Sequence, residues 1–290
     1  MSRREDALQI AHEHGEVLSW IAEMSAMPQS LVWNMCGPLT GTEMGALLIR
    51  WRNAGLVKYT KIGSVRWVWC TAFGNRIVGR APYGDDAPPT EDTWRHVRSV
   101  CLVRAAVESM GGEWLSGRYL RWESENRAAA YTAARTVTTH PPAAPSSHSD
   151  SAASASDSAV SGGVASGSAD SVVTRPVSAA RRRHYPDGIA WLGSRAAGAT
   201  HPWLVRVDGG TSSESDAGLT SLVTTGGTLG AGTTFSVLYA ASPAAFTAAE
   251  ETIAARPDKN LFRLQRLEEL EHEGLKWFRS HSTTPGRSPA

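Results

Sequence analysis

A segment rich in alanine, serine, threonine and glycine runs from residue 128 to residue 180 and divides the chain into two parts. It carries few aromatic or large aliphatic side chains. Such a segment cannot bury enough apolar surface to offset the entropy that it would lose on ordering. The sequence therefore predicts a disordered linker over 128–180. The chain of 290 residues is long enough for an ordinary domain on each side of it.

The stretch from Thr40 to Thr71 carries the clearest structural signals ahead of the linker. Thr40 and Glu43 have the spacing of a capping box, in which each side chain bonds the backbone N–H of the other residue. An apolar stripe with helical spacing follows, and a glycine suited to a helix stop comes after it: Met44, Leu47, Leu48, Trp51 and Gly55. This pattern predicts a helix whose opposite face carries Thr42, Gly45, Ala46, Arg50 and Asn53.

Two β-rich runs, 56–62 and 65–71, follow the expected helix and are joined by Gly63-Ser64. A two-residue loop that begins with glycine is typical of a type II′ hairpin. Lys61 and Arg66 flank this turn and could reach a phosphate backbone. The helix and the hairpin together have the form of a recognition helix and its wing.

Charge is distributed unevenly around this stretch. The whole chain has a formal net charge of +1, yet residues 44–84 contain no Asp or Glu and seven Lys or Arg. A local basic surface is typical of a nucleic-acid interface, although the same charges could simply solvate a small α+β domain. Arginine and asparagine read guanine and adenine edges, so Arg50 and Asn53 are expected to contact bases. The full set of candidate DNA-binding residues is Thr42, Arg50, Arg52, Asn53, Lys58, Lys61 and Arg66.

Further helices are expected on both sides of this stretch. Segments 7–14, 17–27 and 31–35 precede it, and 71–80 follows, which gives a winged helix-turn-helix domain over 1–80. A longer helix is expected over 90–110, with an amphipathic piece over 114–125, as a helical extension over 90–127. The 90–110 helix could form a dimer contact or could pack on its own chain.

After the linker, the sequence predicts a small α/β domain over 181–280. Strands are expected at 189–192, 203–207 and 235–240, with helices at 217–224 and 244–255. An amphipathic helix is expected over 261–278, and the tail over 281–290 is expected to be disordered. The predicted fold class is therefore α+β, with a winged helix and a separate α/β part.

Several classes of protein and site are not supported by the sequence. No stretch approaches the roughly 20 apolar residues of a membrane span, and the N-terminus is too polar for a secretory signal. Cys36, Cys70 and Cys101 form no CxxC pair, which is typical of reduced core thiols in a cytoplasmic protein. The glycine-rich segment 226–232 lacks a GK[ST] or GxGxxG motif. We therefore expect no metal and no cofactor.

Four segments occur in the order SWIAEMSAMP, ALLIRWRNAGLV, RWVWCTAFG and HYPDGIA. In this order they resemble the actinobacterial replication-relaxation family, whose members are found with conjugative plasmids, integrative elements and phages. The resemblance implies an N-terminal winged helix and a C-terminal domain related to the PD-(D/E)xK nuclease fold. It also implies DNA binding in replication, mobilisation or transcriptional regulation of a mobile element.

The nuclease-like part lacks several residues that such a site would use. Asp187 matches the family's PD, but in the next strand Arg206 stands where the first acid is expected, before Asp208. Residues 209–213 supply no lysine. A positively charged Arg206 would repel the divalent metal that such chemistry needs. Asp187 and Asp208 are therefore vestigial candidates, and this chain is not expected to cut DNA. Pro186-Asp187-Gly188 could equally be a plain turn before a strand.

Three functions remain open on the sequence. The first is non-enzymatic binding of double-stranded DNA, with the C-terminal domain contacting a protein partner or a second copy in a homodimer. The second is a metal-dependent nuclease that uses Asp187 and Asp208. The third is a protein-interaction adaptor whose winged helix binds no DNA.

Overall fold

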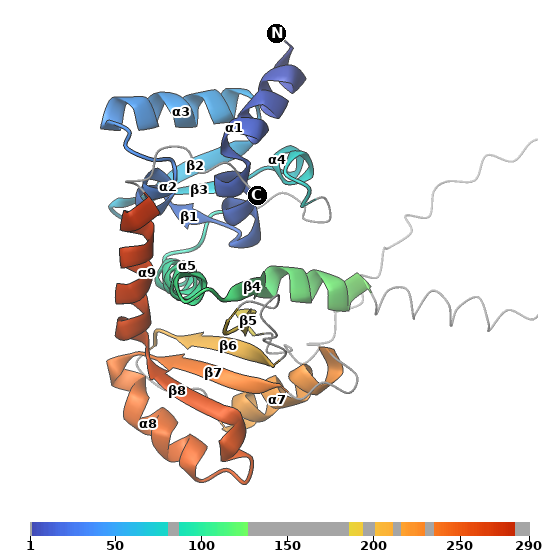
Figure 1. The fold of residues 1–290 in the computed structure, drawn as a ribbon, viewed down its shortest axis with the longest axis vertical. Coiled ribbons are helices and arrows are strands. Elements are labelled where there is room, and N and C mark those ends of the chain that lie inside the picture. Colours follow the sequence, from blue (N-terminus) through green and yellow to red (C-terminus); the bar gives the residue numbers. More distant parts are fainter. Residues whose placement is uncertain are drawn as a thin grey trace, which may run out of the picture. The chain divides into compact units, whose positions relative to one another are not determined.

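The computed structural model describes residues 2–80, 87–126, 186–193, 201–210, 216–229 and 235–281. Residues 1–126 and 184–290 belong to one compact unit. Within the described ranges the fold is mixed α+β with two sheets, as the sequence predicts (Figure 1). The linker expected at 128–180 and residues 282–290 of the expected tail lie outside the described residues, whereas His281, where that tail was expected to begin, ends a helix.

The N-terminal part combines four helices with a small antiparallel sheet of strand order β1-β3-β2. In chain order its elements are α1 (Arg3–Glu23), β1 (Met27–Pro28), α2 (Gln29–Met35), α3 (Gly41–Asn53), β2 (Val57–Ile62), β3 (Val65–Cys70) and α4 (Ala72–Ile77). Segment 7–14 and residues 17–23, expected in separate helices, belong to the single helix α1, which has non-helical backbone at His14. The second helix was expected to continue to residue 27, but α1 ends at Glu23 and Met27 lies in strand β1.

Local signals fix α3 and the hairpin that follows it. The Thr40 hydroxyl accepts a hydrogen bond from the Glu43 backbone N–H, and Glu43 bonds the Thr40 N–H in return, so the predicted capping box forms. Gly55 has φ +79°, which suits a glycine just past the helix end. β2 and β3 pair from Ile62↔Val65 onward, so Gly63-Ser64 is the two-residue turn. Gly63 has φ +59°.

A second sheet of order β4-β5-β6-β7-β8 follows. The first three strands pair antiparallel, whereas β6, β7 and β8 are parallel. In chain order the elements are α5 (Trp94–Ser109), β4 (Glu113–Ser116), β5 (Gly188–Trp191), β6 (Pro202–Asp208), α7 (Asp216–Leu229), β7 (Ser236–Ala241), α8 (Pro243–Ala254), η2 (Lys259–Leu261), β8 (Phe262–Arg266) and α9 (Leu267–His281). A helix also covers 117–126.

Two expectations for this part are corrected by the structure. Residues 262–266, expected to begin a helix, form strand β8, because β7 offers them a parallel backbone ladder. Residues 114–116, expected in an amphipathic helical piece, lie in strand β4 and pair with β5. The strand nearest the linker on its N-terminal side thus belongs to the same sheet as the strands that follow the linker.

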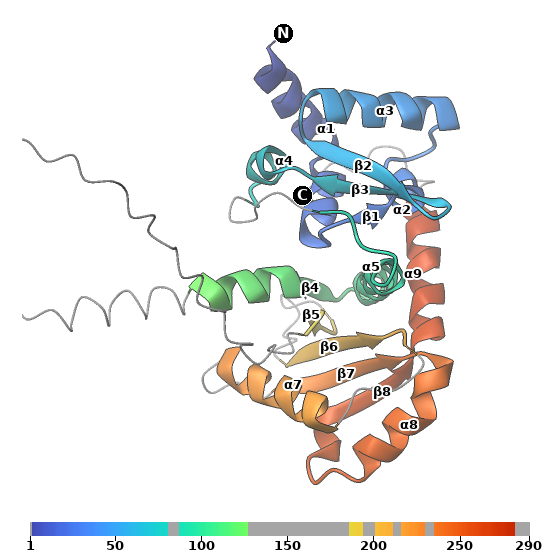
Figure 2. The ribbon, with the colours of Figure 1, turned by 180° about the vertical axis from the view of Figure 1, so that it is seen from behind.

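Helix α5 lies between the two sheets in both views (Figures 1 and 2). Every residue from Ser99 to Val107 on it is buried. It packs against α9 so closely that a Cβ at Gly274 would meet the backbone carbonyl of Leu102. One apolar cluster therefore joins the N-terminal helices, α5, α9 and one face of the larger sheet. A second cluster lies on the opposite face, under α7 and α8.

None of the helices in the described ranges has both the length and the apolar character that crossing a membrane requires.

Candidate nucleic-acid interface

Helix α3 lies at one end of the described fold, on the side of β2 that is away from the larger sheet (Figure 1). Its inner positions Met44, Leu48 and Trp51 are fully buried in the core. Four of its exposed positions recur at i, i+4, i+7 and i+11, which places these four in one stripe along the helix. We call this stripe the outer face of α3, and it consists of Thr42, Ala46, Ile49 and Asn53.

Positive charge gathers beside this face, where α3 meets the hairpin. The guanidinium of Arg52 lies 5.3 Å from the centre of the Tyr59 ring, and that of Arg66 lies 5.6 Å from it. Lys61 pairs in register with Arg66 and lies two residues from Tyr59 on the same side of β2. We call Arg52, Tyr59, Lys61 and Arg66 the Tyr59 cluster. The ring holds two cations in place at a surface where each such contact contributes about 0.5–1 kcal/mol.

The cations of the Tyr59 cluster keep their charge available to a partner. Arg52, Lys61 and Arg66 are exposed. Across the ranges that the structure describes, no carboxylate forms an ion pair with any of the three. Three cations without such a counter-charge favour an anionic ligand.

Arg50 lies on the other flank of α3, toward α1. Its guanidinium is 3.2 Å from an Asp6 oxygen and 2.9 Å from a Glu13 oxygen. These bonds, with Glu13 first, raise the pKa of Arg50 further above its usual range. Burial acts in the opposite direction and lowers the pKa of Arg50, but the two carboxylates outweigh it. Arg50 is thus engaged within the chain and contributes little free positive charge to the outer face.

Lys58 also lies apart from the Tyr59 cluster. Its position pairs with Trp69, which packs in a small cluster with Trp67 and Ala26 on the opposite side of the hairpin. Of the seven sequence candidates, Arg52, Lys61 and Arg66 lie around Tyr59, and Thr42 and Asn53 lie on the outer face of α3. Tyr59 was missed, because an aromatic residue in a strand usually signals only packing.

The two nuclease-like candidates lie in the C-terminal part, just before β5 and at the end of β6. One Asp187 oxygen is 2.9 Å from His96 Nε2, and the other accepts a hydrogen bond of 2.8 Å from the Val207 N–H. An Arg206 nitrogen lies 3.9 Å away. Asp208 instead accepts hydrogen bonds from the Tyr239 hydroxyl at 2.7 Å and from the Gly210 N–H at 3.0 Å.

The surroundings of Asp187 set its charge. Burial raises its pKa, but the hydrogen bond and positive charge of His96, with Arg206 and the Val207 N–H, outweigh burial and hold the pKa below its usual range. Burial lowers the pKa of His96, and Asp187 outweighs that effect and raises it. With a histidine and an arginine already around it, Asp187 does not suit a divalent cation. Within the described residues, no three His, Cys, Asp or Glu side chains are grouped to hold a metal.

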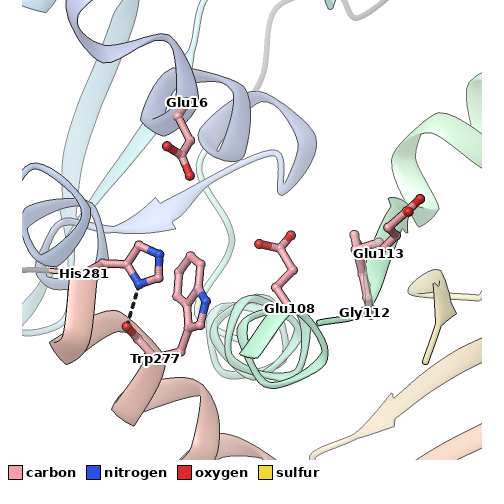
Figure 3. A pocket seen from close by; sticks show the side chains of 7 residues that line it. Glu16, Glu108, Gly112, Glu113, Trp277 and His281 are labelled. Atoms are coloured by element: carbon pink, nitrogen blue, oxygen red, sulfur yellow. Dashed lines mark hydrogen bonds between the residues drawn. The ribbon is translucent and has the colours of Figure 1, made fainter. Parts of the chain in front are cut away.

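A cavity of about 440 Å³ lies elsewhere, between α1, α5, β4 and α9 (Figure 3). Acidic side chains dominate its lining, and burial outweighs the nearby Arg104 to raise the pKa of Glu108. The lining residues are Glu16, Glu108, Gly112, Glu113, Trp114, Trp277 and His281. Carboxylates repel phosphate, so this cavity does not form part of the candidate interface.

Comparison with protein-family models, curated proteins and solved structures finds no match for this chain. Its function is therefore argued from the residues themselves.

Proposed function

We propose that this protein binds double-stranded DNA without cutting it, through a winged helix built from α1, α2, α3 and the β2–β3 hairpin. In this proposal α3 is the recognition helix and the hairpin is the wing. The observation that carries it is the Tyr59 cluster. It sets three exposed cations, held by no described carboxylate, beside a helix whose outer face is small or polar at three of its four positions.

In this proposal the cations of the Tyr59 cluster contact the phosphates of the DNA, and the outer face of α3 contacts the base edges. Arg52, Lys61 and Arg66 contact backbone phosphates, which position the protein on the duplex and supply most of the salt-dependent affinity. The outer face of α3 enters the major groove, which admits an α-helix. Asn53 can there bond the N6 and N7 atoms of adenine, and Thr42 can bond either a base or a phosphate.

The biological setting follows from the resemblance described above. We propose a role in replication, mobilisation or transcriptional regulation of a mobile element in the cytoplasm. The C-terminal part would then contact a protein partner or a second copy, and a homodimer would bind a site with two-fold symmetry.

Binding of the full chain to a labelled random-sequence duplex tests this proposal. Affinity should fall steeply between about 50 and 200 mM salt, because phosphate contacts release condensed cations. The double variant Lys61→Ala/Arg66→Ala should weaken binding and reduce the slope of log affinity against log salt by about 2. A matched variant, Lys259→Ala/Arg263→Ala, removes the same charge from exposed positions on η2 and β8 and should bind as the wild type does.

Two outcomes would overturn the proposal. One is the absence of binding at low salt, which would favour the adaptor function. The other is equal weakening in both double variants, which would mean that net charge, and not this surface, attracts DNA. Thermal unfolding of all variants shows whether each still folds.

A further inference from the structure

Ile49 is an apolar side chain at the centre of the outer face of α3. It is 47% exposed, one of three large hydrophobic side chains that are exposed in the described part of the chain. It belongs to none of the apolar clusters or to the partly buried residues packed on them. Packing among the described residues therefore does not explain why an isoleucine occupies this position.

The neighbours of Ile49 leave it prominent. Ala46 and Gly45, one turn toward the N-terminus, are small, and a Cβ added at Gly45 would meet nothing within 4 Å. Asn53 and Thr42 are short polar side chains on the same stripe. A surface that approaches this face of α3 would therefore contact the Ile49 methyl groups first. The hydrogen-bonding groups of Thr42 and Asn53 lie on either side of Ile49 along the helix.

The charges on the two flanks indicate which surface that is. On the hairpin side lie the cations of the Tyr59 cluster, and on the α1 side the single charge of Arg50 is paired with two carboxylates, those of Asp6 and Glu13. A second protein copy would need an apolar interface core, because stable interfaces bury on the order of 1,200 Å² or more. Here the exposed apolar surface is one isoleucine beside an alanine. Charge complementarity instead favours the major groove of DNA.

We propose that Ile49 contacts the C5-methyl group of thymine, so that this protein prefers duplexes with A·T pairs where the middle of α3 meets the major groove. The proposal rests on the proposed function above and adds a base preference to it. The C5-methyl is the apolar group that thymine presents in the major groove, and small or apolar side chains recognise it there. Asn53, one turn further along α3, can bond the adenine of a neighbouring pair.

The test compares two duplexes of equal length, one of alternating adenine and thymine and one of alternating adenine and uracil. Both are deoxynucleotide duplexes that differ in the C5-methyl group alone, and every register of the protein on them meets only A·T or only A·U pairs. Burial of one methyl corresponds to about fourfold in affinity. The full chain should therefore bind the thymine duplex about fourfold more tightly than the uracil duplex.

Two variants assign the difference to Ile49. Ile49→Ala should bind both duplexes equally, and Ile49→Val should keep part of the preference. Leu8→Ala is the matched control, since Leu8 is also an exposed aliphatic residue, on α1, at 51% exposure. It should keep the full preference. If uracil altered affinity through duplex stiffness, the Ile49→Ala variant would still bind the two duplexes differently. Equal binding by this variant therefore excludes that explanation.

The outcomes separate this inference from the function on which it rests. Salt-dependent binding with equal affinity for both duplexes would overturn the role of Ile49 and leave DNA binding intact. A thymine preference that survives Ile49→Ala would overturn it as well. If neither duplex binds at low salt, the proposed function itself fails. A change in oligomeric state of Ile49→Ala without a change in duplex preference would assign the residue to a protein contact instead.

Discussion

Asp187 keeps a negative charge in a nearly buried position because donors and cations surround its carboxylate. Its side chain is 11% exposed, and His96 is 39% exposed. The two residues come from opposite sides of the 128–180 segment, so their hydrogen bond connects α5 with the start of β5. An ion pair of this kind costs most when one partner is removed, because the other is left without compensation.

The pair makes stability depend on pH. The pKa of His96 is raised in the folded chain, so its contribution is fully present below about pH 6.5 and is lost as pH rises through the folded pKa. We therefore expect His96→Gln to lower the free energy of unfolding by about 1 kcal/mol near pH 5.5 and by less near pH 8.5. Urea unfolding at both pH values measures this difference.

A histidine on another helix provides the control for this experiment. His272 is exposed on α9, and His272→Gln should cost little at either pH. Equal losses for His96→Gln at the two pH values would show that its effect is packing and not charge. The dependence on pH is opposite for Asp187, because its pKa is lowered in the folded chain. Its contribution to stability is present above about pH 3.9, the pKa of a free aspartate, and is lost as pH falls through the folded pKa.

Long-range contacts of this type could not be predicted from the sequence. Asp187 was singled out, but nothing in the pattern points to a histidine 91 residues earlier. Arg50 was expected to read bases, and its partners on α1 lie 44 and 37 residues away. Helical spacing predicts the face of the helix on which a charged side chain lies. Which residue of opposite charge pairs with that side chain depends on the element that packs against this face.

At the scale of elements, prediction succeeded where the signals were local. The capping box, the apolar stripe and the glycine turn placed α3 and the β2–β3 hairpin, because each depends on residues a few positions apart. It failed for residues 262–266, whose strand exists only because β7 lies alongside. A short apolar run can be a helix or a strand, and its neighbours decide.

The close packing of α9 on α5 at Gly274 can be tested by alanine substitution, with Gly45, which has no neighbour within 4 Å of an added Cβ, as the comparison. A Cβ at Gly274 on α9 would collide with the Leu102 carbonyl on α5, and a backbone atom cannot move aside as a flexible side chain can. We expect Gly274→Ala to lower the free energy of unfolding by about 1–3 kcal/mol. Gly45→Ala on α3 meets no neighbour and should raise it by up to about 1 kcal/mol through helix propensity.

Chemical denaturation of both variants measures the contrast. Gly274→Ala with wild-type stability would mean that α9 can shift along α5 without loss of packing. Because Gly45 borders the outer face of α3, its variant also shows whether that helix can be made more stable without altering DNA affinity.

At the scale of the whole molecule, the two parts of the chain share one core. Trp20 on α1 packs against Phe278 on α9, with ring centres 5.6 Å apart. β4 enters the sheet of the C-terminal strands, and α5 is buried against both sheets. The same apolar cluster includes residues of nearly every layer, among them Ile21, Trp51, Leu102, Val205 and Phe278. The winged helix that we propose is thus supported by elements from the far end of the sequence.

This shared core predicts that cutting the chain between residues 127 and 183 leaves the two pieces associated. With a protease site inserted there, cleaved protein should elute as one species of unchanged size and should unfold in a single transition, because separation would expose the apolar faces of α5 and α9. Gly274→Ala in the same background should make the pieces separate at lower denaturant concentration. Elution as two folded species would instead mean that each part folds around a sufficient core of its own.

The fragment 1–126 alone distinguishes the same two possibilities. If each part has its own core, this fragment should still bind DNA. The shared core predicts instead that the fragment exposes α5 and aggregates.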